Sequence, residues 1–413
     1  MIKNIFFDLD DTIFDFQKAE HNAICQTMMH FGIEPNDALC QKYSEINLIH
    51  WKKLETGEIT RNEVKTGRVK VFFNTLGIMA DEKEAAKFYE KELSKGHYYI
   101  EGAHDLIKAL SEKYQLFLIS NGTASVQKSR IASSDLKLYM NDIFISEIIG
   151  YNKPDLRFFE KCFESIPNFK KEESIIIGDS LTSDILGGIN AGVKTIWFNR
   201  FNLCPPNQNK PDYIIHHLND FIPLLDKIQL IESIKAFRPW NEQEAKDQQL
   251  ILSYIQSFKD IFSRNNPIAH MTASAWVVNP EKTKTLMVYH NIYQSWSWLG
   301  GHADDDTNLP GVALKEISEE SGIPLDRLTL VSPDIYSLEV LTVDGHEKKG
   351  SYVSSHLHLN ITYLIEANPS DPVFIKPDEN SGVAWFSLED AIKVSTEPWY
   401  QHRIYPKLNA KLI

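Results

Sequence analysis

Two aspartates placed two residues apart, Asp8 and Asp10, follow the apolar run at residues 4–7. One carboxylate of such a pair can attack phosphorus while the other shuttles a proton, which splits phosphate ester hydrolysis into two easier steps. A solvated acidic loop or a calcium loop is the alternative interpretation. An EF-hand loop counted from Asp8 would need glycine where Ile13 stands, so the spacing disfavours calcium.

Three later segments carry the other groups that phosphoryl transfer requires. Ser120 and Asn121 supply a hydroxyl and backbone N–H groups, and Lys153 supplies a cation for the phosphoryl oxygens. Asp179 and Asp184 supply further carboxylates of the kind that bind magnesium. We therefore expect these segments and the aspartate pair to form one site for phosphate chemistry.

The elements that must position these groups follow from the apolar pattern. Short apolar segments at residues 4–7, 116–119, 174–177 and part of 144–149 are separated by segments with helical periodicity. This alternation predicts an α/β fold with a parallel, doubly wound sheet, whose ligands bind beyond the carboxyl ends of the strands.

An insert at about residues 16–98 carries helical patterns alone. Thr60 and Glu63 have the spacing of a capping box, and Asp81 begins another helical stretch. Directly after the first strand, such an insert has the position of a lid over the active end of the sheet. An ordinary helical subdomain would give the same periodicity.

The four motifs described above occur in the order found in the haloacid dehalogenase superfamily, and about residues 1–228 resemble that family. The resemblance implies a Rossmannoid parallel sheet with a helical cap of the C1 type at about residues 16–98. It also implies a phosphatase rather than a dehalogenase, because the second aspartate, Asp10, is present.

The same resemblance implies a role for each motif residue. Asp8 would be the nucleophile and Asp10 the general acid/base, while Ser120, Asn121 and Lys153 would bind the phosphoryl group. Four residues would form the Mg²⁺ site. They are Asp8, Asp10 through its backbone carbonyl, and Asp179 and Asp184 of the fourth motif.

Residues 182–192, together with residues 51–60 of the insert, resemble the pyrimidine 5'-nucleotidase branch of this superfamily. Sugar-phosphate phosphatases and phosphoglucomutase-like members share the same core. The resemblance makes a nucleoside monophosphate the favoured substrate class. Trp51 or Phe72 could stack on a base, although an aromatic residue at helical spacing more often belongs to the core of the cap.

A second acidic cluster, Glu316, Glu319 and Glu320, has the spacing i, i+3 and i+4, so the three carboxylates project from one face of a helix. Like charges in this arrangement repel one another unless a divalent cation lies between them. Taken by itself, this acidic cluster would be interpreted as a solvent-exposed face of a helix. Gly322 follows at a position suited to a helix end.

This helix and the preceding residues 298–301 resemble the Nudix box, and about residues 231–413 resemble a Nudix hydrolase with an α/β/α sandwich fold. The resemblance implies hydrolysis of a nucleoside diphosphate linked to a group X, with Glu319 and Glu320 in catalysis. The glutamates expected to bind Mg²⁺ or Mn²⁺ are Glu316, Glu319 and Glu320. Thr307 stands in place of the first glutamate of the motif and Lys315 in place of its arginine, whose two-pronged geometry lysine lacks.

Two other features of this region could serve chemistry. His356, His358 and Asn360 alternate on one face of a predicted strand, where the histidines could contact a phosphate or a metal or simply face a partner strand. Glu379 precedes an apolar strand, and we interpret it as an exposed loop acid rather than an additional metal ligand.

Composition limits the remaining possibilities. The 413 residues predict two or three domains, and a net charge of −13 disfavours nucleic acid polymers as partners. Apolar runs are too short for a membrane span, and the first residues lack the order of charged, apolar and small residues that a signal peptide has. The four cysteines have no C-x-x-C spacing, which disfavours a zinc site or a disulfide framework. We expect a cytoplasmic protein with small phosphates and nucleotides as partners, and the sequence predicts no oligomeric state.

The sequence thus favours a bifunctional hydrolase with domains at 1–228 and 231–413. A Nudix reaction leaves a monophosphate, which the first domain would dephosphorylate, so the two steps could be sequential. The alternative is a phosphatase regulated by a non-catalytic Nudix domain that senses nucleotides. Thr307 and Lys315 motivate this alternative, because a binding domain can relax residues that catalysis needs.

Overall fold

The computed structural model describes residues 2–205, 207–258, 260–348 and 351–412. The chain divides into two compact units, Met1–Ile222 and Pro223–Ile413, and the division falls within helix α10 (Phe221–Ala236). The domain limits of 1–228 and 231–413 stay predictions. In the described part of the chain, none of the helices combines the length and apolar composition that crossing a bilayer requires.

Strand β1 lies inside a six-stranded parallel sheet in the first unit. It pairs with β2 on one side and β4 on the other, so that Phe7 stands opposite both Leu118 and Ile177. The strands are short, buried apolar runs, as is usual in parallel sheets, and the predicted α/β fold is confirmed. The order is β3 (Asp142–Ile145), β2 (Gln115–Ser120), β1 (Asn4–Asp8), β4 (Ser174–Gly178), β5 (Lys194–Phe198) and β6 (Tyr213–Ile215).

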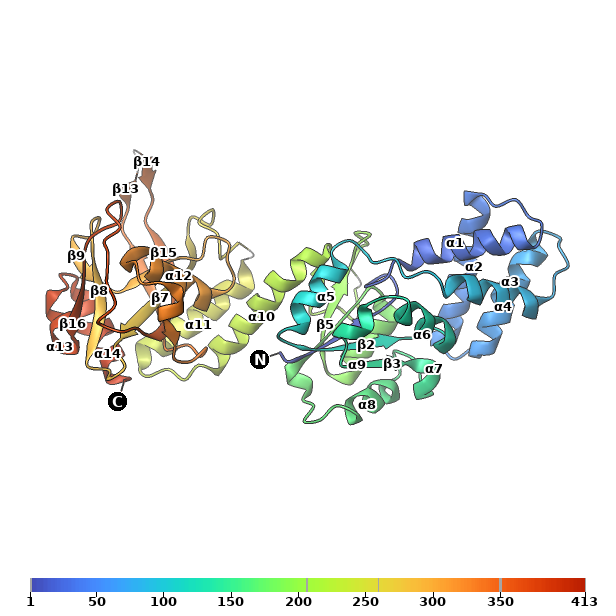
Figure 1. Ribbon diagram of the computed structural model, residues 1–413, viewed down its shortest axis with the longest axis horizontal. Helices are drawn as coiled ribbons and strands as arrows, with labels where there is room; N and C mark the ends of the chain where they lie inside the picture. Colours follow the sequence, from blue (N-terminus) through green and yellow to red (C-terminus); the bar gives the residue numbers. More distant parts are fainter. Residues whose placement is uncertain (1, 206, 259, 349–350, 413) are drawn as a thin grey trace. The chain divides into compact units, whose positions relative to one another are not determined.

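Helices pack around this sheet (Figure 1). Aromatic side chains of α8 pack against Phe6 and Phe117 of the sheet. Of residues 144–149 only the part up to Ile145 is strand, because a short helix follows and ends at Gly150, which has a φ of 90°. The helices are α5 (Ala103–Ser111), α6 (Ala124–Ala132), α7 (Ser146–Ile149), α8 (Leu156–Glu164) and α9 (Leu186–Ala191).

The insert forms four helices with a core of their own, drawn in blue in Figure 1. The predicted capping box is present, since Thr60 and Glu63 cap each other's backbone N–H groups at the start of α3. Asp81 likewise caps α4. Phe72 is fully buried in the core of the insert. The helices are α1 (Phe16–His30), α2 (Asp37–Glu55), α3 (Arg61–Thr75) and α4 (Glu82–Leu93).

The second unit is built on an eight-stranded mixed sheet. Its long strands β7 and β15 are parallel neighbours, and β10 pairs antiparallel with β7. The strands are β7 (Ala269–Val278), β8 (Lys284–His290), β9 (Ser295–Ser297), β10 (Leu299–His302), β11 (Thr329–Leu330), β12 (Ser337–Val343), β15 (His356–Glu366) and β16 (Asn380–Ser387), while β13 (His346–Lys348) and β14 (Ser351–Val353) form a separate hairpin.

Strand β7 shows how helices cover both faces of this sheet. Met271 and alternate residues join a core with α10, α11 and α12, whereas Trp276 joins a second core with Tyr405 and Leu408 of α14. This is the α/β/α arrangement expected from the sequence. The helices after α10 are α11 (Glu242–Ser257), α12 (Leu309–Ser321), α13 (Leu388–Val394) and α14 (Tyr405–Ala410).

Candidate active site

The parallel strands of the first unit bring the predicted phosphate-processing residues to one edge of the sheet. Asp8 ends β1, Ser120 ends β2, and Asp179 directly follows β4. Because these strands are parallel neighbours, their carboxyl ends meet. All seven residues expected at this site line one cavity: Asp8, Asp10, Ser120, Asn121, Lys153, Asp179 and Asp184.

Lys153 is buried at the floor of this cavity, where its ammonium group joins two carboxylates. Its Nζ donates to Asp8 Oδ1 at 2.5 Å, to Asp184 Oδ1 at 2.6 Å and to the carbonyl of Ile119 at 3.2 Å. Burial lowers the pKa of Lys153, but the charges of Asp184 and Asp8 outweigh burial and the net shift is upward. Lysine therefore stays charged here.

The backbone of Lys153 is held by Asn121. The side-chain amide of Asn121 donates to the Lys153 carbonyl at 2.9 Å and accepts from its N–H at 2.9 Å. This two-bond contact joins the loop after β2 to the lysine loop. Asn121 thus positions the cation, a role the sequence did not suggest.

Three carboxylates beside this lysine form a set suited to a divalent cation. Oxygens of Asp8, Asp179 and Asp184 lie within 4.8 Å of one another. Burial raises the pKa of both Asp8 and Asp179, and the charge of Asp184 adds to the rise, while Lys153 lowers it. Because one lysine balances only part of three carboxylates, these hard oxygen donors fit Mg²⁺.

Asp184 is fixed by the loop that follows β4. The N–H of Ser180 donates to Asp184 Oδ2 at 3.0 Å. Gly178 leaves the necessary space, since a Cβ there would lie 2.4 Å from Asp184 Cγ. A glycine at this position is therefore required by the close approach of the carboxylate.

Asp10 is oriented by two residues of helix α6 that the sequence analysis missed. Gln127 Nε2 donates to Asp10 Oδ2 at 2.6 Å, and the buried Arg130 donates to the other oxygen. Gln127 also donates to Ser120 Oγ at 2.8 Å. Their spacing of i and i+3 on a helix that begins just after Ser120 is the signal that would have found them. In the described part of the chain, the close carboxylate set does not include the side chain of Asp10.

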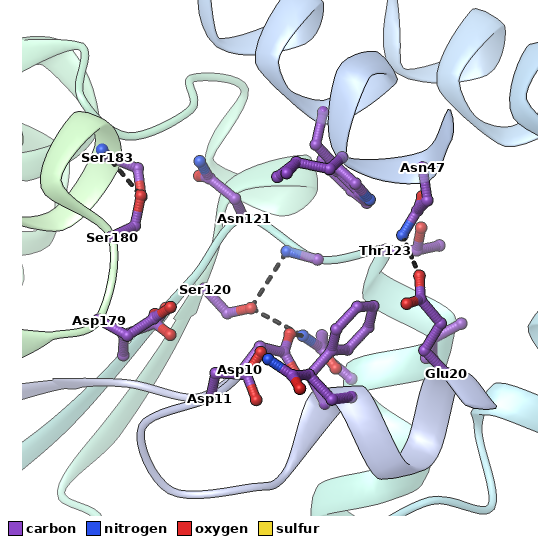
Figure 2. Close-up of a pocket in the computed structure, with 18 of the residues that line it drawn as sticks. Asp10, Asp11, Glu20, Asn47, Ser120, Asn121, Thr123, Asp179, Ser180 and Ser183 are labelled. Atoms are coloured by element: carbon purple, nitrogen blue, oxygen red, sulfur yellow. Dashed lines mark hydrogen bonds between the residues drawn. The ribbon is translucent and has the colours of Figure 1, made fainter. Parts of the chain in front are cut away.

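The cavity has a volume of about 360 Å³ and extends from the strand ends to the helical insert. In Figure 2 Glu20 and Asn47 of the insert lie across this space from Asp10 and Ser120. Asn47 Nδ2 donates to Glu20 Oε1 at 2.5 Å, and Arg68 Nη1 donates to Asn47 Oδ1 at 2.8 Å. Burial raises the pKa of Glu20.

Of the two aromatic residues considered for base stacking, only Trp51 lines the cavity. The suggestion for Phe72 is wrong, because its ring is fully buried in the core of the insert. Trp51 is half-buried and lies near the Arg68 guanidinium, which is 6.0 Å from the ring centre.

Arg61, at the start of α3, fastens the insert to the sheet. It donates to the carbonyls of Asn121 at 2.6 Å and Gly122 at 3.1 Å and to Ser146 Oγ at 2.6 Å. These bonds tie the insert to the loop that carries the phosphate-binding residues. The insert therefore has the position of a cap over the site.

The second acidic cluster lies on α12 in the other unit. Glu320 Oε2 accepts from the N–H of Gly300 at 3.1 Å, and the Glu316 carboxylate lies so close to Gly301 that a Cβ there would be 2.4 Å from it. Burial raises the pKa of Glu320 to about 8 and also raises the pKa of Glu316. Glu319 is more exposed and pairs with Lys376 at 3.3 Å.

In the described residues, the oxygens of these three glutamates do not form as close a set as those of the first unit. Glu379, interpreted from the sequence as an exposed acid, pairs with Lys376 at 2.9 Å, and its charge raises the pKa of Glu316 and Glu320. Glu379 therefore faces the same site as the glutamate helix.

The two departures from the Nudix motif have contacts of their own. Thr307 Oγ1 donates to Asp226 Oδ2 of α10 at 3.0 Å, so this residue fastens a helix instead of supplying a carboxylate. Lys315 Nζ lies 3.6 Å from Glu319 Oε1. A single ammonium contact takes the place of the two-pronged arginine contact.

Comparison with known proteins places both units. Residues 5–198 match the haloacid dehalogenase-like hydrolase family, and residues 269–408 match the NUDIX domain family. The chain is 38% identical over 233 residues to the pyrimidine 5'-nucleotidase PynA of Streptococcus pneumoniae, which covers 56% of this chain and 98% of that protein. It is 27% identical over 223 residues to the pyrimidine 5'-nucleotidase YjjG of Escherichia coli, covering 54% and 97%.

A solved structure gives the same fold for the first unit. The HAD-hydrolase YfnB from Bacillus subtilis, bound to magnesium, is 36% identical with a TM-score of 0.52, covering 54% of this chain and 98% of that one. The match spans nearly the whole of each relative. The chain therefore belongs to the haloacid dehalogenase-like hydrolases and carries a NUDIX domain in its second unit.

Proposed function

We propose that the first unit is a Mg²⁺-dependent phosphatase that acts on nucleoside monophosphates. The observation that carries the proposal is the convergence of Asp8, Lys153 and two further carboxylates at the floor of a cavity that a helical cap covers. Two relatives are pyrimidine 5'-nucleotidases, which supports the substrate class. A magnesium-bound relative supports the metal.

In this proposal the residues divide the chemistry between them. An Asp8 oxygen attacks phosphorus and forms an aspartyl phosphate, and Asp10 protonates the departing ester oxygen. Asp10 then takes a proton from the water that hydrolyses this intermediate, which releases phosphate and restores Asp8. Lys153 balances the charge of the carboxylates throughout. Mg²⁺ held by Asp8, Asp179 and the Asp10 carbonyl, with Asp184 in support, would neutralise charge on the phosphoryl oxygens.

The cap supplies the groups that would recognise the rest of the substrate. The cavity of about 360 Å³ falls in the usual range for small-ligand sites. Trp51 offers an aromatic face, and the linked Glu20, Asn47 and Arg68 side chains offer donors and acceptors. This combination suits a base edge better than a plain sugar phosphate, which is the alternative substrate class.

A phosphate-release screen tests this proposal. The full chain with Mg²⁺ is assayed against pyrimidine and purine nucleoside monophosphates and against sugar phosphates, with Asp8→Asn as the control. We expect the highest kcat/KM on a pyrimidine nucleotide and no release by the variant. Preference for sugar phosphates would overturn the substrate class, and turnover by Asp8→Asn would overturn the mechanism.

We further propose that the second unit hydrolyses a nucleoside diphosphate linked to another group. Glu316 and Glu320 lie against the β10 backbone with Glu379 nearby, which gathers carboxylates for Mg²⁺ or Mn²⁺. Glu319 would complete the set on the exposed side of α12. The test is release of a nucleoside monophosphate from nucleoside diphosphate sugars and related compounds, which Glu320→Gln should abolish.

A nucleotide-sensing role is the second candidate, and the Thr307–Asp226 contact favours it. In the Nudix motif a glutamate stands at this position, whereas here Thr307 holds α10. This alternative predicts nucleotide binding without pyrophosphate hydrolysis and a change in phosphatase rate on binding. Hydrolysis that Glu320→Gln abolishes would decide against it.

A further inference from the structure

Four histidines of the second unit lie together on one face of its sheet. His270 is on β7 and stands directly opposite His358 of β15, while His356 lies two residues earlier on β15. His302 ends β10 and stands opposite Thr272, two residues after His270. Because side chains alternate along strands, these positions all point to the same side.

The histidine nitrogens are close enough to share one ion. One ring nitrogen from each of the four residues lies within 4.8 Å of the others, and His356 Nε2 is 3.2 Å from His358 Nε2. Four ligands around Zn²⁺ at about 2.0–2.1 Å would lie about 3.3 Å apart. Closing these separations from at most 4.8 Å to about 3.3 Å would give tetrahedral spacing.

Backbone contacts orient two of the rings for binding. His270 Nδ1 lies 3.2 Å from the Asn266 carbonyl, and His356 Nδ1 lies 2.8 Å from the Ser354 carbonyl. A carbonyl only accepts, so Nδ1 is the protonated nitrogen and the lone pair is on Nε2. Holding a metal-ligand histidine by its other nitrogen is the usual arrangement around protein metals.

His270 gives an independent observation that points to a ligand at this cluster. Its side chain is 4% exposed, and its Nε2 has no hydrogen-bond partner among the described residues. A buried polar nitrogen without a partner is costly and rare in folded proteins. A cation at the centre of the cluster would satisfy it.

Two of the histidines, His270 and His358, favour the neutral form that metals bind. Burial, with the charges of neighbouring histidines, lowers the pKa of His358 to about 2, and burial lowers the pKa of His270. Imidazole donors suit Zn²⁺, Cu²⁺ or Ni²⁺, whereas the carboxylate sites suit Mg²⁺. The chemistry of the donors thus separates this cluster from the glutamates of α12.

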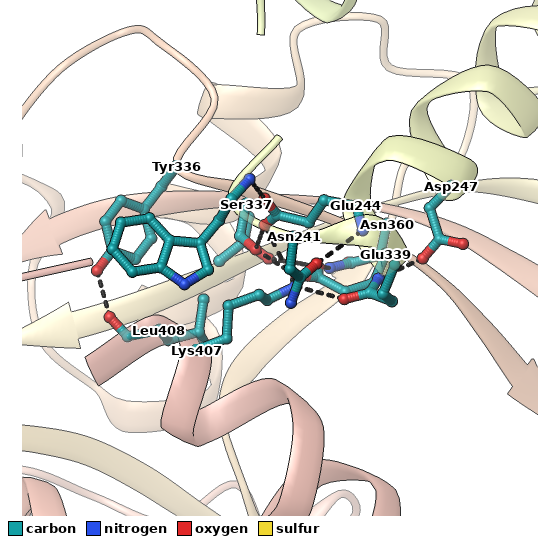
Figure 3. Close-up of polar contacts among 12 residues, drawn as sticks. Asn241, Glu244, Asp247, Tyr336, Ser337, Glu339, Asn360, Lys407 and Leu408 are labelled. Carbon is teal, nitrogen blue, oxygen red and sulfur yellow. Dashed lines mark hydrogen bonds and ion pairs between the residues drawn. The ribbon is translucent and has the colours of Figure 1, made fainter. Parts of the chain in front are cut away.

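The same face of the sheet continues as a buried polar layer beyond the histidines. Asn360 accepts from Thr272 and Ser274 and donates to Glu339, so it belongs to this fixed network, part of which Figure 3 shows. Asn360 alternates with His356 and His358 on the same strand face, but its side chain is already hydrogen-bonded. We therefore do not include it among the candidate metal ligands.

We propose that His270, His302, His356 and His358 bind one transition-metal ion, with Zn²⁺ preferred. The ion joins β7, β10 and β15, and it binds independently of either hydrolytic activity. Since His302 follows Gly300 and Gly301, which contact the glutamates of α12, the ion also holds the strand on which that site rests.

Zn²⁺ binding to the full chain, first stripped with a chelator, tests the proposal. Excess Mg²⁺ occupies the carboxylate sites, and bound Zn²⁺ is counted after dialysis. We expect His302→Asn combined with His356→Asn to lose one equivalent of Zn²⁺ per chain. The exposed His402, changed to Asn, is the matched control and should keep the wild-type count.

Two controls distinguish the histidine cluster from a second group of donors in the first unit. His21, Cys25 and Cys40 form another close set, so Cys25→Ser identifies any zinc held there. Co²⁺ bound to the wild-type chain should give the intense visible absorption of four-coordinate nitrogen ligation, a result that does not depend on a variant folding. An unchanged zinc count in the double variant, or a wild-type chain whose Co²⁺ lacks that absorption, overturns the proposal.

Discussion

At the scale of single residues, the site of the first unit depends on how each carboxylate is held. Asp8 and Asp184 share one buried lysine, whereas Asp10 is held by Gln127 and Arg130 of helix α6. The nucleophile and the proton-transfer group thus have separate partners. This separation lets the proposed acid/base residue act without disturbing the metal-binding carboxylates.

Changing Arg130 to Met should therefore impair proton transfer more than binding. Asp10 would lose its fixed orientation, and we expect kcat to fall about 100-fold with little change in KM, within the usual contribution of acid/base catalysis. Steady-state kinetics on the preferred nucleotide measures both constants. Arg157→Met removes an exposed arginine that pairs with Asp155 and should have no effect. Equal losses in the two variants would contradict the assignment.

The glutamate helix predicts a pH dependence of stability when metal is absent. Burial raises the pKa of Glu320 from 4.5 to about 8, so between these values the folded state binds a proton that the unfolded chain releases. Stability should then fall as pH rises through this range, by about 1.4 kcal/mol per pKa unit at most. Thermal unfolding with a chelator measures it, and Glu320→Gln should flatten the slope.

At the scale of elements, a buried charge network joins α11, β12 and α14 in the second unit. Lys407 lies 3.2 Å from Glu244 and 2.8 Å from Glu339 (Figure 3). Lys411 also contacts Glu244. Burial raises the pKa of Glu244, but Lys407 and the bonds from Lys411 and Ser337 outweigh it, so the net shift is downward. The charges of two lysines balance those of two glutamates. The network therefore stabilises the fold only when all four members are present.

Removing one member should leave a buried charge without a partner. We expect Lys407→Met to lower the free energy of unfolding by about 3–5 kcal/mol, measured by urea denaturation of the full chain. Lys393→Met removes an exposed lysine that pairs with Glu389 and should change stability by less than about 1 kcal/mol. A similar small change for both would show that the network contributes little.

The contacts of α3 make a separate prediction about the cap. Arg61→Ala removes the bonds to the loop after β2, so the cap should close less firmly over a nucleotide. We expect KM for the nucleotide to rise roughly 10-fold, while hydrolysis of a small aryl phosphate changes less. Lys70→Ala, on the same helix and exposed, is the control.

At the scale of the whole molecule, two hydrolase folds share one chain, and this arrangement predicts coupled products. The wild type should convert a nucleoside diphosphate sugar into nucleoside and phosphate, whereas Asp8→Asn should accumulate the nucleoside monophosphate. Glu320→Gln should release neither. An equal mixture of the two variants carries out both steps, but with the two active domains on different chains. If the mixture releases phosphate more slowly than the wild type, covalent linkage of the domains contributes to the rate.

The sequence by itself determined the elements and the order of the motifs. Apolar runs of strand length and the capping box at Thr60 are local signals, and each appears where it was expected. The residues at strand ends could be named in advance, because parallel strands place their carboxyl ends at one edge. The proposed catalytic roles and the cytoplasmic location remain predictions.

Tertiary structure alone decided the contacts between residues distant in the chain. It placed Arg130 on Asp10, buried Phe72 while leaving Trp51 in the cavity, and gathered histidines from three strands into one cluster. Periodicity indicates which face of an element is buried but not which distant face packs against it. Strand pairing and side-chain packing supply that information, because they depend on the whole chain at once.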